Sequence, residues 1–188
     1  ATSAARMIQQ CNSLGISHRI IPFPATTSWV KVTREKPKFI LNQLEELQTP
    51  VIWTDVDNHL ISKPSFVDGY MENLDIAVPE IEKARIAKWM PDNARINSAV
   101  IWVNNTVRAK DFLKQWISRC ESESVCGDHS LLVKLWSENL DASDIRLCTT
   151  GSELCSVTKN HDSYFVYGKS NVSAKTKELR ASIAKLNS

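Results

Sequence analysis

Apolar residues recur at helical spacing along several stretches of the chain. In residues 3–14 they are Met7, Ile8, Cys11 and Leu14, which fall on one side of a helix, and Gly15 follows as a stop signal. The same periodicity marks residues 36–48, 106–120 and 128–139, and it returns in residues 173–187. The pattern therefore predicts a helix over each of these segments, and a shorter one over 65–74.

Shorter apolar runs lie between these helices and have the length and the β-branched content of strands. They are residues 17–23, 50–53, 75–80, 98–103, 144–148 and 163–167, whereas 25–36 and 151–162 read as loops. The alternation favours an α/β fold with a mixed, mainly parallel sheet flanked by helices. A length of 188 residues fits a single domain over 1–188 with its own core and a C-terminal helix at about 173–187.

Charge and cysteine content narrow the class of protein. The formal net charge of +2 is too small for the basic surface of a nucleic-acid-binding protein, so no nucleic-acid partner is expected. The five cysteines form no CxxC pair, which disfavours a disulfide framework and a thiolate zinc site and favours reduced thiols in the cytoplasm. No apolar run approaches the ~20 residues of a membrane span. We expect a soluble, cytoplasmic protein.

The stretch TPVIWTDVDNHLISKP places two aspartates directly after an apolar run. If the strand continues through Asp55 and Asp57, residues two apart face the same side and both carboxylates can converge on one point. Two close carboxylates repel, and a hard divalent cation such as Mg²⁺ or Mn²⁺ removes that cost. The alternative is an exposed turn with two solvated aspartates.

The order of several motifs resembles the glycosyltransferases of the GT-A fold, the nucleotide-diphospho-sugar transferases. The matching segments are KPKFILNQL, TPVIWTDVDNHLISKP, RINSAVIWVNNT, FLKQW, GDHSLL and HDSYFVYGKSN, between about Lys36 and Asn171. The resemblance implies a GT-A-like (Rossmann-like) domain that moves a sugar from a nucleotide-sugar donor, UDP-sugar favoured, to a saccharide or lipid-linked acceptor, by a retaining reaction. Asp55 and Asp57 would hold Mn²⁺ (or Mg²⁺) against the donor diphosphate.

The resemblance also suggests residues around the transferring sugar. Asn97 and Ser98 match an asparagine-led segment at the start of a central strand, with Ala99 where glycine is usual, and Asn97 would face the sugar. Asp128 matches an acidic residue at a helix start that orients the acceptor, although His129 follows it in place of glutamine. The alternatives are a turn residue for Asn97 and a helix cap for Asp128.

Further residues could complete the metal and phosphate contacts. His161 resembles the third protein ligand of the metal, and Lys169 resembles a lysine that touches the diphosphate. Arg34, Lys36 and Lys38 could also reach the donor phosphates, or form a solvated basic turn.

Two other functions compete with sugar transfer. Haloacid-dehalogenase-like phosphatases also carry two aspartates after an apolar strand, and a non-catalytic nucleotide- or sugar-binding module of the same fold would look alike locally. The final helix carries Lys175, Lys177, Arg180 and Lys185, which could lie on an anionic membrane or simply face water.

Overall fold

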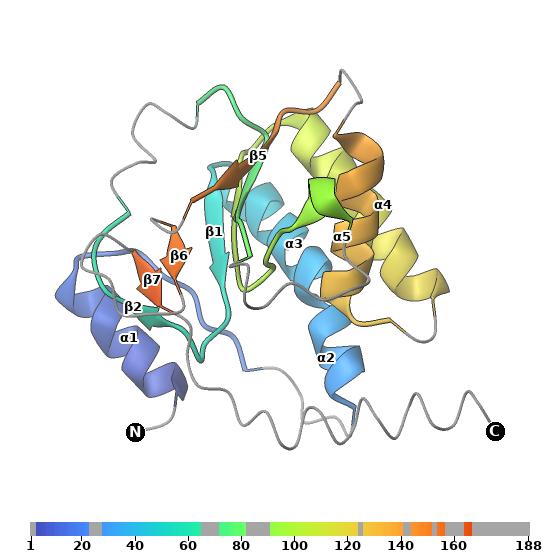
Figure 1. The fold of residues 1–188 in the computed structure, drawn as a ribbon. Helices are drawn as coiled ribbons and strands as arrows, with labels where there is room; N and C mark the ends of the chain where they lie inside the picture. The colour runs from blue at the N-terminus through green and yellow to red at the C-terminus, as the bar shows by residue number, and fades with distance from the viewer. Residues whose placement is uncertain are drawn as a thin grey trace.

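Four strands form a sheet in the middle of the structure, and helices cover one of its faces (Figure 1). The computed structural model describes residues 3–22, 28–64, 72–81, 91–123, 126–140, 144–151, 154–156 and 164–166. The strands are β1 (Val51–Thr54), β3 (Ile76–Pro79), β4 (Val100–Val103) and β5 (Leu147–Thr150), in the order β1-β4-β3-β5.

The direction of β4 decides which chain segments meet at each edge of this sheet. β4 runs antiparallel to both neighbours, with Val51 opposite Val103 and Ile76 opposite the same Val103, whereas β3 and β5 are parallel. β1, β3 and β5 therefore point the same way. Their carboxyl ends share one edge of the sheet with the amino end of β4, which brings the loop before β4 to that edge.

A layer of helices packs on one face of the sheet and holds the main core. The helices are α2 (Trp29–Arg34), α3 (Lys36–Leu47), α4 (Val107–Ser122) and α5 (Asp128–Asn139), with the short 3-10 turn η3 (Asp92–Ala94) beside α5. Ile40, Leu44, Phe112 and Leu113 pack with Leu131 against strand residues, each essentially without solvent exposure. None of the described helices is long and apolar enough to cross a bilayer.

A second, smaller unit lies on the other side of β1 (Figure 1). The helix α1 (Ser3–Ser13) covers the strands β2 (His59–Leu60), β7 (Phe165–Val166) and β6 (Cys155–Ser156), which pair in that order. Met7 and Cys11 of α1 are buried with Leu60, Phe165 and Val100 in a separate apolar cluster. Since β2 follows β1 after four residues, this unit holds the chain just beyond the end of β1.

The mixed α/β class and most of the predicted elements are confirmed. The helices predicted at 3–14, 36–48, 106–120 and 128–139 are present, and strands overlap the ranges predicted at 50–53, 75–80, 98–103, 144–148 and 163–167, although β5 shares only its first two residues with its predicted range. The sheet is mixed, because β1, β3 and β5 share a direction whereas both pairings of β4 are antiparallel. The C-terminal helix and residues 65–71 of the predicted short helix lie outside the described residues.

Several local predictions are wrong. The predicted loop 151–162 contains the strand β6 (Cys155–Ser156). Residues 17–22 form no strand: Ile21 and Pro22 are exposed, and proline lacks the N–H that a strand partner needs. Part of the predicted loop 25–36 is the helix α2, whose N-cap Ser28 accepts from the Lys31 N–H at 3.4 Å; six residues are too few to show periodicity. Val107 is an apolar residue of the helix predicted at 106–120, where an inward position is expected, but it is 75% exposed because it opens the helix.

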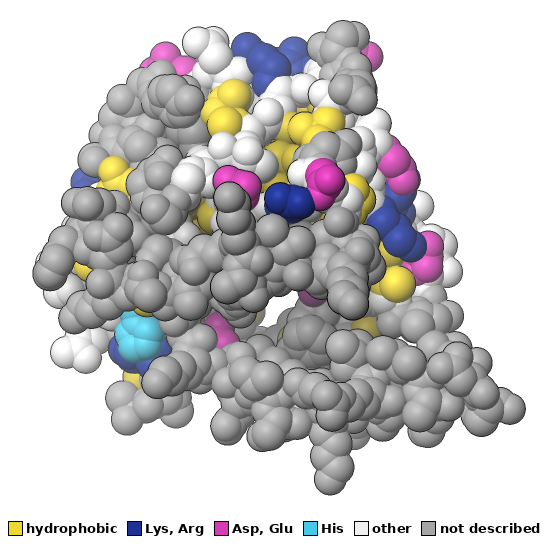
Figure 2. All heavy atoms as spheres, viewed as in Figure 1, with side chains coloured by type: hydrophobic (Ala, Val, Ile, Leu, Met, Phe, Trp, Pro, Cys, Tyr) yellow, Lys and Arg dark blue, Asp and Glu magenta, His cyan; other side chains and the backbone are white. Residues whose placement is uncertain are grey.

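Charged side chains do not form a single-sign surface on the face seen in Figure 2. Over the described part of that face, acidic and basic groups are interspersed among apolar and neutral polar side chains. This is the arrangement of an ordinary solvated surface.

Candidate active site

The loop that enters β4 lies against the carboxyl end of β1. Thr54 pairs with Val100, and the Asp55 N–H donates to the Ala99 carbonyl at 2.9 Å, which extends the antiparallel pairing by one residue. Asp55 is the first residue after β1. The fold therefore brings the predicted metal-binding aspartate to the segment that contains Asn97 and Ser98.

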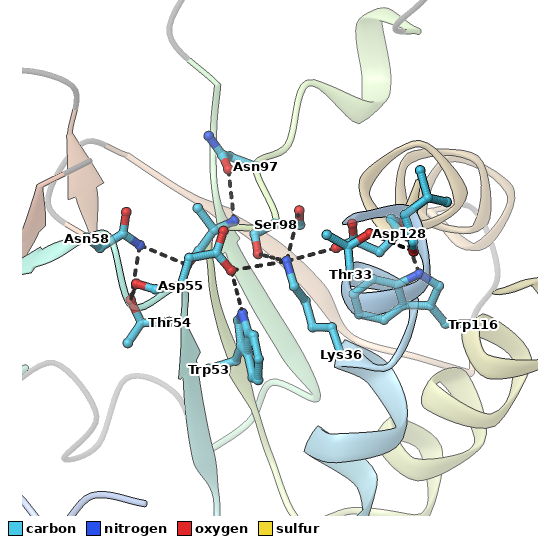
Figure 3. A network of polar contacts seen from close by, with 12 residues as sticks. Thr33, Lys36, Trp53, Thr54, Asp55, Asn58, Asn97, Ser98, Trp116 and Asp128 are labelled. Atoms are coloured by element: carbon cyan, nitrogen blue, oxygen red, sulfur yellow. Dashed lines mark hydrogen bonds and ion pairs between the residues drawn. The ribbon is translucent and has the colours of Figure 1, made fainter. Parts of the chain in front are cut away.

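A buried ammonium group joins the carboxylates at this edge (Figure 3). The Nζ of Lys36, the first residue of α3, lies 2.8 Å from Asp128 Oδ2 and 3.3 Å from Asp55 Oδ1. It also donates to the Ser98 carbonyl at 3.0 Å and lies 5.5 Å from the centroid of the Trp53 ring. The side chains of Lys36 and Asp128 are 6% and 4% exposed, and that of Asp55 is 37% exposed. Lys36 thus links a buried carboxylate to one that meets solvent.

Burial and ion pairing act in opposite directions on these groups. Burial alone would lower the pKa of Lys36, but the attraction of Asp128 and Asp55 outweighs it, so the pKa lies above its ordinary value. Loss of water raises the pKa of Asp55, and Lys36 with the Trp53 Nε1–H, 3.0 Å from Oδ1, offsets only part of this. The two carboxylates therefore favour the charged form of Lys36, whereas burial outweighs the neighbouring positive charge at Asp55.

Asp55 and Asp57 lie in a tight turn, so the expected continuation of the strand is wrong. The Asn58 N–H donates to the Asp55 carbonyl at 3.0 Å, which closes the turn directly after β1. The buried Asn58 side chain also donates to Thr54 Oγ1 and to the Ala99 carbonyl, both at 3.0 Å. The sequence Asp-Val-Asp-Asn is rich in turn-forming residues, which outweighed strand propensity here. We call residues 55–58 the DxD turn.

Asp128 opens α5 without capping it, so the helix-cap interpretation is wrong. The N-cap is the residue before it, with no side-chain bond, and the Asp128 carboxylate faces Lys36 instead. The indole of Trp116 donates to the Asp128 carbonyl at 3.1 Å. Arg34 donates to the nearby Cys126 carbonyl from Nε at 3.0 Å and from Nη2 at 2.6 Å. Side chains from three helices therefore fix the position of Asp128.

Asn97 and Ser98 support the loop at the end of β1. Asn97 Oδ1 accepts from the Ala99 N–H at 2.9 Å, which is the local bond of a turn residue. Ser98 is buried, and its carbonyl and Oγ accept from Lys36 at 3.0 Å and 3.5 Å. Both residues shape the candidate site, and a contact of either with a sugar stays a prediction.

The remaining predicted residues do not join this cluster within the described structure. Lys38 is exposed and, two positions after Lys36, lies on another side of α3. His161 and Lys169 lie outside the described residues. Among the residues that the structure describes, no three His, Cys, Asp or Glu side chains gather as a metal site.

Sequence reasoning missed the central place of Lys36. The sequence groups it with Arg34 and Lys38 as one basic stretch, but only Lys36 is in register with Ile40 and Leu44 on the buried side of α3. Lys36 lies one helical turn before Ile40 and two before Leu44, so it belongs to the same buried side. A buried lysine needs carboxylates as partners. That spacing is the signal that could have identified it.

The charges and ligand types at this edge suit a hard divalent cation. Formal charges of −3 from Asp55, Asp57 and Asp128 and +1 from Lys36 leave −2. The Lys36 and Trp53 contacts of Asp55 both fall on Oδ1, so its Oδ2 is directed elsewhere. Carboxylate oxygens are the preferred ligands of Mg²⁺ and acceptable ligands of Mn²⁺. Asp55 is therefore chemically suited to such an ion, Asp57 follows it in the same turn, and further ligands would come from outside this cluster.

Comparisons with known proteins identify the family of this chain and a similar fold. A family model of nucleotide-diphospho-sugar transferases matches residues 22–177. A crystal structure of a glycosyltransferase involved in the glycosylation of the major capsid of PBCV-1 has a similar fold, with a TM-score of 0.63 and 15% identity over 93% of this chain and 91% of that one. No curated protein sequence matches. Because the family model covers most of the sequence, this chain belongs to the nucleotide-diphospho-sugar transferase family.

Proposed function

We propose that this chain is a metal-dependent hexosyltransferase that moves a sugar from a UDP-sugar to a hydroxyl group of a saccharide or lipid-linked acceptor. The observation that carries the proposal is the position of Asp55. It lies at the carboxyl end of β1, is partly exposed, and is joined through Lys36 to the buried Asp128. In open α/β sheets, ligands bind at this edge. Family membership favours sugar transfer over the phosphatase alternative.

Asp55 and Asp57, with His161, are the proposed ligands of Mn²⁺ or Mg²⁺. Such an ion supplies positive charge beside the departing diphosphate. Lys169, Lys38 and Arg34 are further proposed phosphate contacts. Arg34 is the least available of these, because its guanidinium already donates twice to the Cys126 carbonyl.

Asp128 and Asn97 are proposed to orient the sugar and the acceptor. The Asp128 carboxylate is buried and engaged by Lys36 at 2.8 Å, which suits a fixed orienting group better than a base that collects a proton. This favours a retaining reaction, in which no protein base is required. The Asn97 Oδ1 is used by the Ala99 N–H, so its Nδ2 is the atom proposed to meet the sugar.

The proposal is tested by calorimetric titration of UDP and GDP, with and without Mn²⁺. We expect Mn²⁺-dependent binding of UDP to the wild type and its loss in Asp55→Asn/Asp57→Asn, because asparagine keeps the shape and removes the charge. Asp111→Asn is the matched control, since Asp111 is exposed on α4 and pairs only locally with Lys114 at 2.9 Å. Failure of both nucleotides to bind with Mn²⁺ would contradict the proposed donor site.

A turnover assay distinguishes an enzyme from a binding module of the same fold. We expect release of UDP from a UDP-hexose with Mn²⁺ and a mixture of saccharide acceptors, with no release by the doubly substituted variant. Binding of UDP without release from any UDP-hexose would favour the non-catalytic alternative. Contact of residues 173–187 with anionic membranes stays a separate prediction, testable by vesicle sedimentation.

A further inference from the structure

One arginine of α1 contacts three consecutive carbonyl groups of the DxD turn. The Nη2 of Arg6 donates to the Asp57 carbonyl at 3.0 Å, to the Asn58 carbonyl at 3.3 Å and to the Val56 carbonyl at 3.5 Å. These contacts join residues fifty positions apart in the sequence. The described part of the chain offers Arg6 no carboxylate within ion-pair distance, so its charge faces the carbonyl dipoles of the turn.

A second polar side chain of α1 holds the chain just after the turn. Gln10 lies one helical turn after Arg6, and its Oε1 accepts from the Leu60 N–H at 3.2 Å. Between them Met7 is buried against Leu60 in the apolar cluster of the smaller unit. Arg6 and Gln10 are therefore carried by a helix that is itself fixed by packing, and both act on residues 56–60.

We infer that α1 is a clamp that positions the DxD turn, with Arg6 as the positioning residue for Asp57. The inference rests on the proposed function, because it assigns the clamp the task of presenting Asp57 to a divalent cation. It adds to what the family match supplies, since α1 precedes the matched residues 22–177. The bonds of Asn58 hold the turn from one side, and a guanidinium on three of its carbonyls restricts its backbone further.

The clamp makes a prediction about backbone motion that is independent of any ligand. In Arg6→Gln, the amides of the DxD turn and of Leu60 should exchange hydrogen about tenfold faster than in the wild type, measured by mass spectrometry. Arg119→Gln is the matched control, because Arg119 of α4 also makes two side-chain bonds, both to Glu138 of α5 and neither to the DxD turn. It should leave exchange in the turn unchanged.

The positioning role is tested by Mn²⁺ titration of the same proteins. We expect Arg6→Gln to bind Mn²⁺ about tenfold more weakly, as for other groups that orient metal ligands, with Arg119→Gln equal to the wild type. Arg6→Lys, which keeps the charge but has one compact donor group, should fall between the two. Equal exchange and equal Mn²⁺ affinity in Arg6→Gln and wild type would overturn the inference.

Failure of the clamp and failure of the proposed function give different results. If the wild type binds no Mn²⁺, the proposed metal site is wrong, and the exchange rates still decide whether α1 holds the turn. If Arg6→Gln does not fold, Gln10→Ala serves in its place, since it removes only the bond to Leu60. Faster exchange of the DxD-turn amides as well as of Leu60 in Gln10→Ala supports the clamp, and unchanged exchange in the turn contradicts it.

Discussion

Lys36 is the residue on which the candidate site depends most. Replacing it by methionine keeps most of the side-chain volume but leaves Asp128 buried without its counter-ion. Breaking a buried pair in this way costs roughly 3–5 kcal/mol. We therefore expect Lys36→Met to lower the free energy of unfolding by about that amount, measured by urea denaturation at pH 7. A loss below about 1 kcal/mol would show that the pair is not formed.

Two variants separate the loss of the ion pair from a general effect on α3. Lys38→Met changes an exposed lysine of the same helix and should alter stability by less than about 0.5 kcal/mol. Lys36→Met/Asp128→Asn removes the isolated charge as well and should recover part of the lost stability. Recovery in the double variant is the sign of a direct pair.

At the residue scale, sequence identified the aspartates but not their partners. Asp55 and Asp128 could be found because motifs place them after a strand and at a helix start. Lys36 could not be ranked above Arg34 and Lys38 by charge, because only burial distinguishes them. The role of Asn58 could not be predicted either, because its side-chain amide donates to the Ala99 carbonyl, in a loop far along the sequence.

Asp75 connects three elements at the edge of the sheet opposite the candidate site. Its fully buried carboxylate accepts from Thr106 Oγ1 at 2.6 Å, from Arg108 Nε at 2.9 Å and from the Arg146 N–H at 2.9 Å. Thr106 in turn caps α4 through the Ala109 N–H at 3.1 Å. One carboxylate thus ties the start of β3 to the start of α4 and to the segment before β5.

Asparagine at position 75 should weaken all of these connections. It places an amide N–H₂ where donors converge and removes the charge, so we expect a loss of about 2–3 kcal/mol in the free energy of unfolding at pH 7. Urea denaturation measures the loss. Asp111→Asn, at an exposed position of α4, should stay within about 0.5 kcal/mol of the wild type. A similarly small change at both positions would contradict this view.

The contribution of Asp75 should depend on pH in a defined direction. Burial alone would raise the pKa of Asp75, but hydrogen bonds from Arg108, Thr106 and the Arg146 backbone outweigh it, so the pKa lies below its ordinary value. A lowered native pKa stabilises the fold above the unfolded-state value of about 3.9, and this gain is lost as pH falls through the native value. The stability difference between wild type and Asp75→Asn should therefore be constant near neutrality and shrink below about pH 4. A difference that grows on acidification would refute this assignment.

At the element scale, hydrophobic periodicity predicted the helices that are long enough to show it. Helices of eleven residues or more, such as α1 and α4, show their apolar stripes in the sequence, whereas the six residues of α2 are too few to show one. The DxD turn shows the opposite error. Extended geometry through Asp55 and Asp57 would align their carboxylates, but hydrogen bonds by Asn58 close a turn there, as in the alternative interpretation. The turn-forming residues outweighed the strand-like alternation in determining the backbone conformation there.

At the scale of the whole molecule, the sequence predicted the class of fold but not the direction of β4. The short apolar run 98–103 reads the same for a parallel or an antiparallel strand. Its antiparallel direction is what brings Ser98 and Ala99 to the end of β1, where they meet Lys36 and Asp55. Which residues meet at the site therefore depends on the topology of the sheet. That topology is determined by pairing between strands that lie far apart in the sequence.

Binding of the donor should stabilise the whole domain, since ligands that bind only the folded state shift unfolding by mass action. At a UDP concentration of 100 times its dissociation constant, with Mn²⁺ saturating, the gain is about 2.7 kcal/mol. For a chain of this length that corresponds to a rise of about 5–10 °C in Tm, measured by scanning calorimetry.

If the metal bridges Asp55 and the diphosphate, the rise with Mn²⁺ and UDP together should exceed the sum of the two separate rises, because each ligand then completes the site of the other. Asp55→Asn should abolish this excess, whereas Asp111→Asn should retain it. Strictly additive rises in the wild type would mean that metal and nucleotide bind apart, and the DxD turn would then need another role.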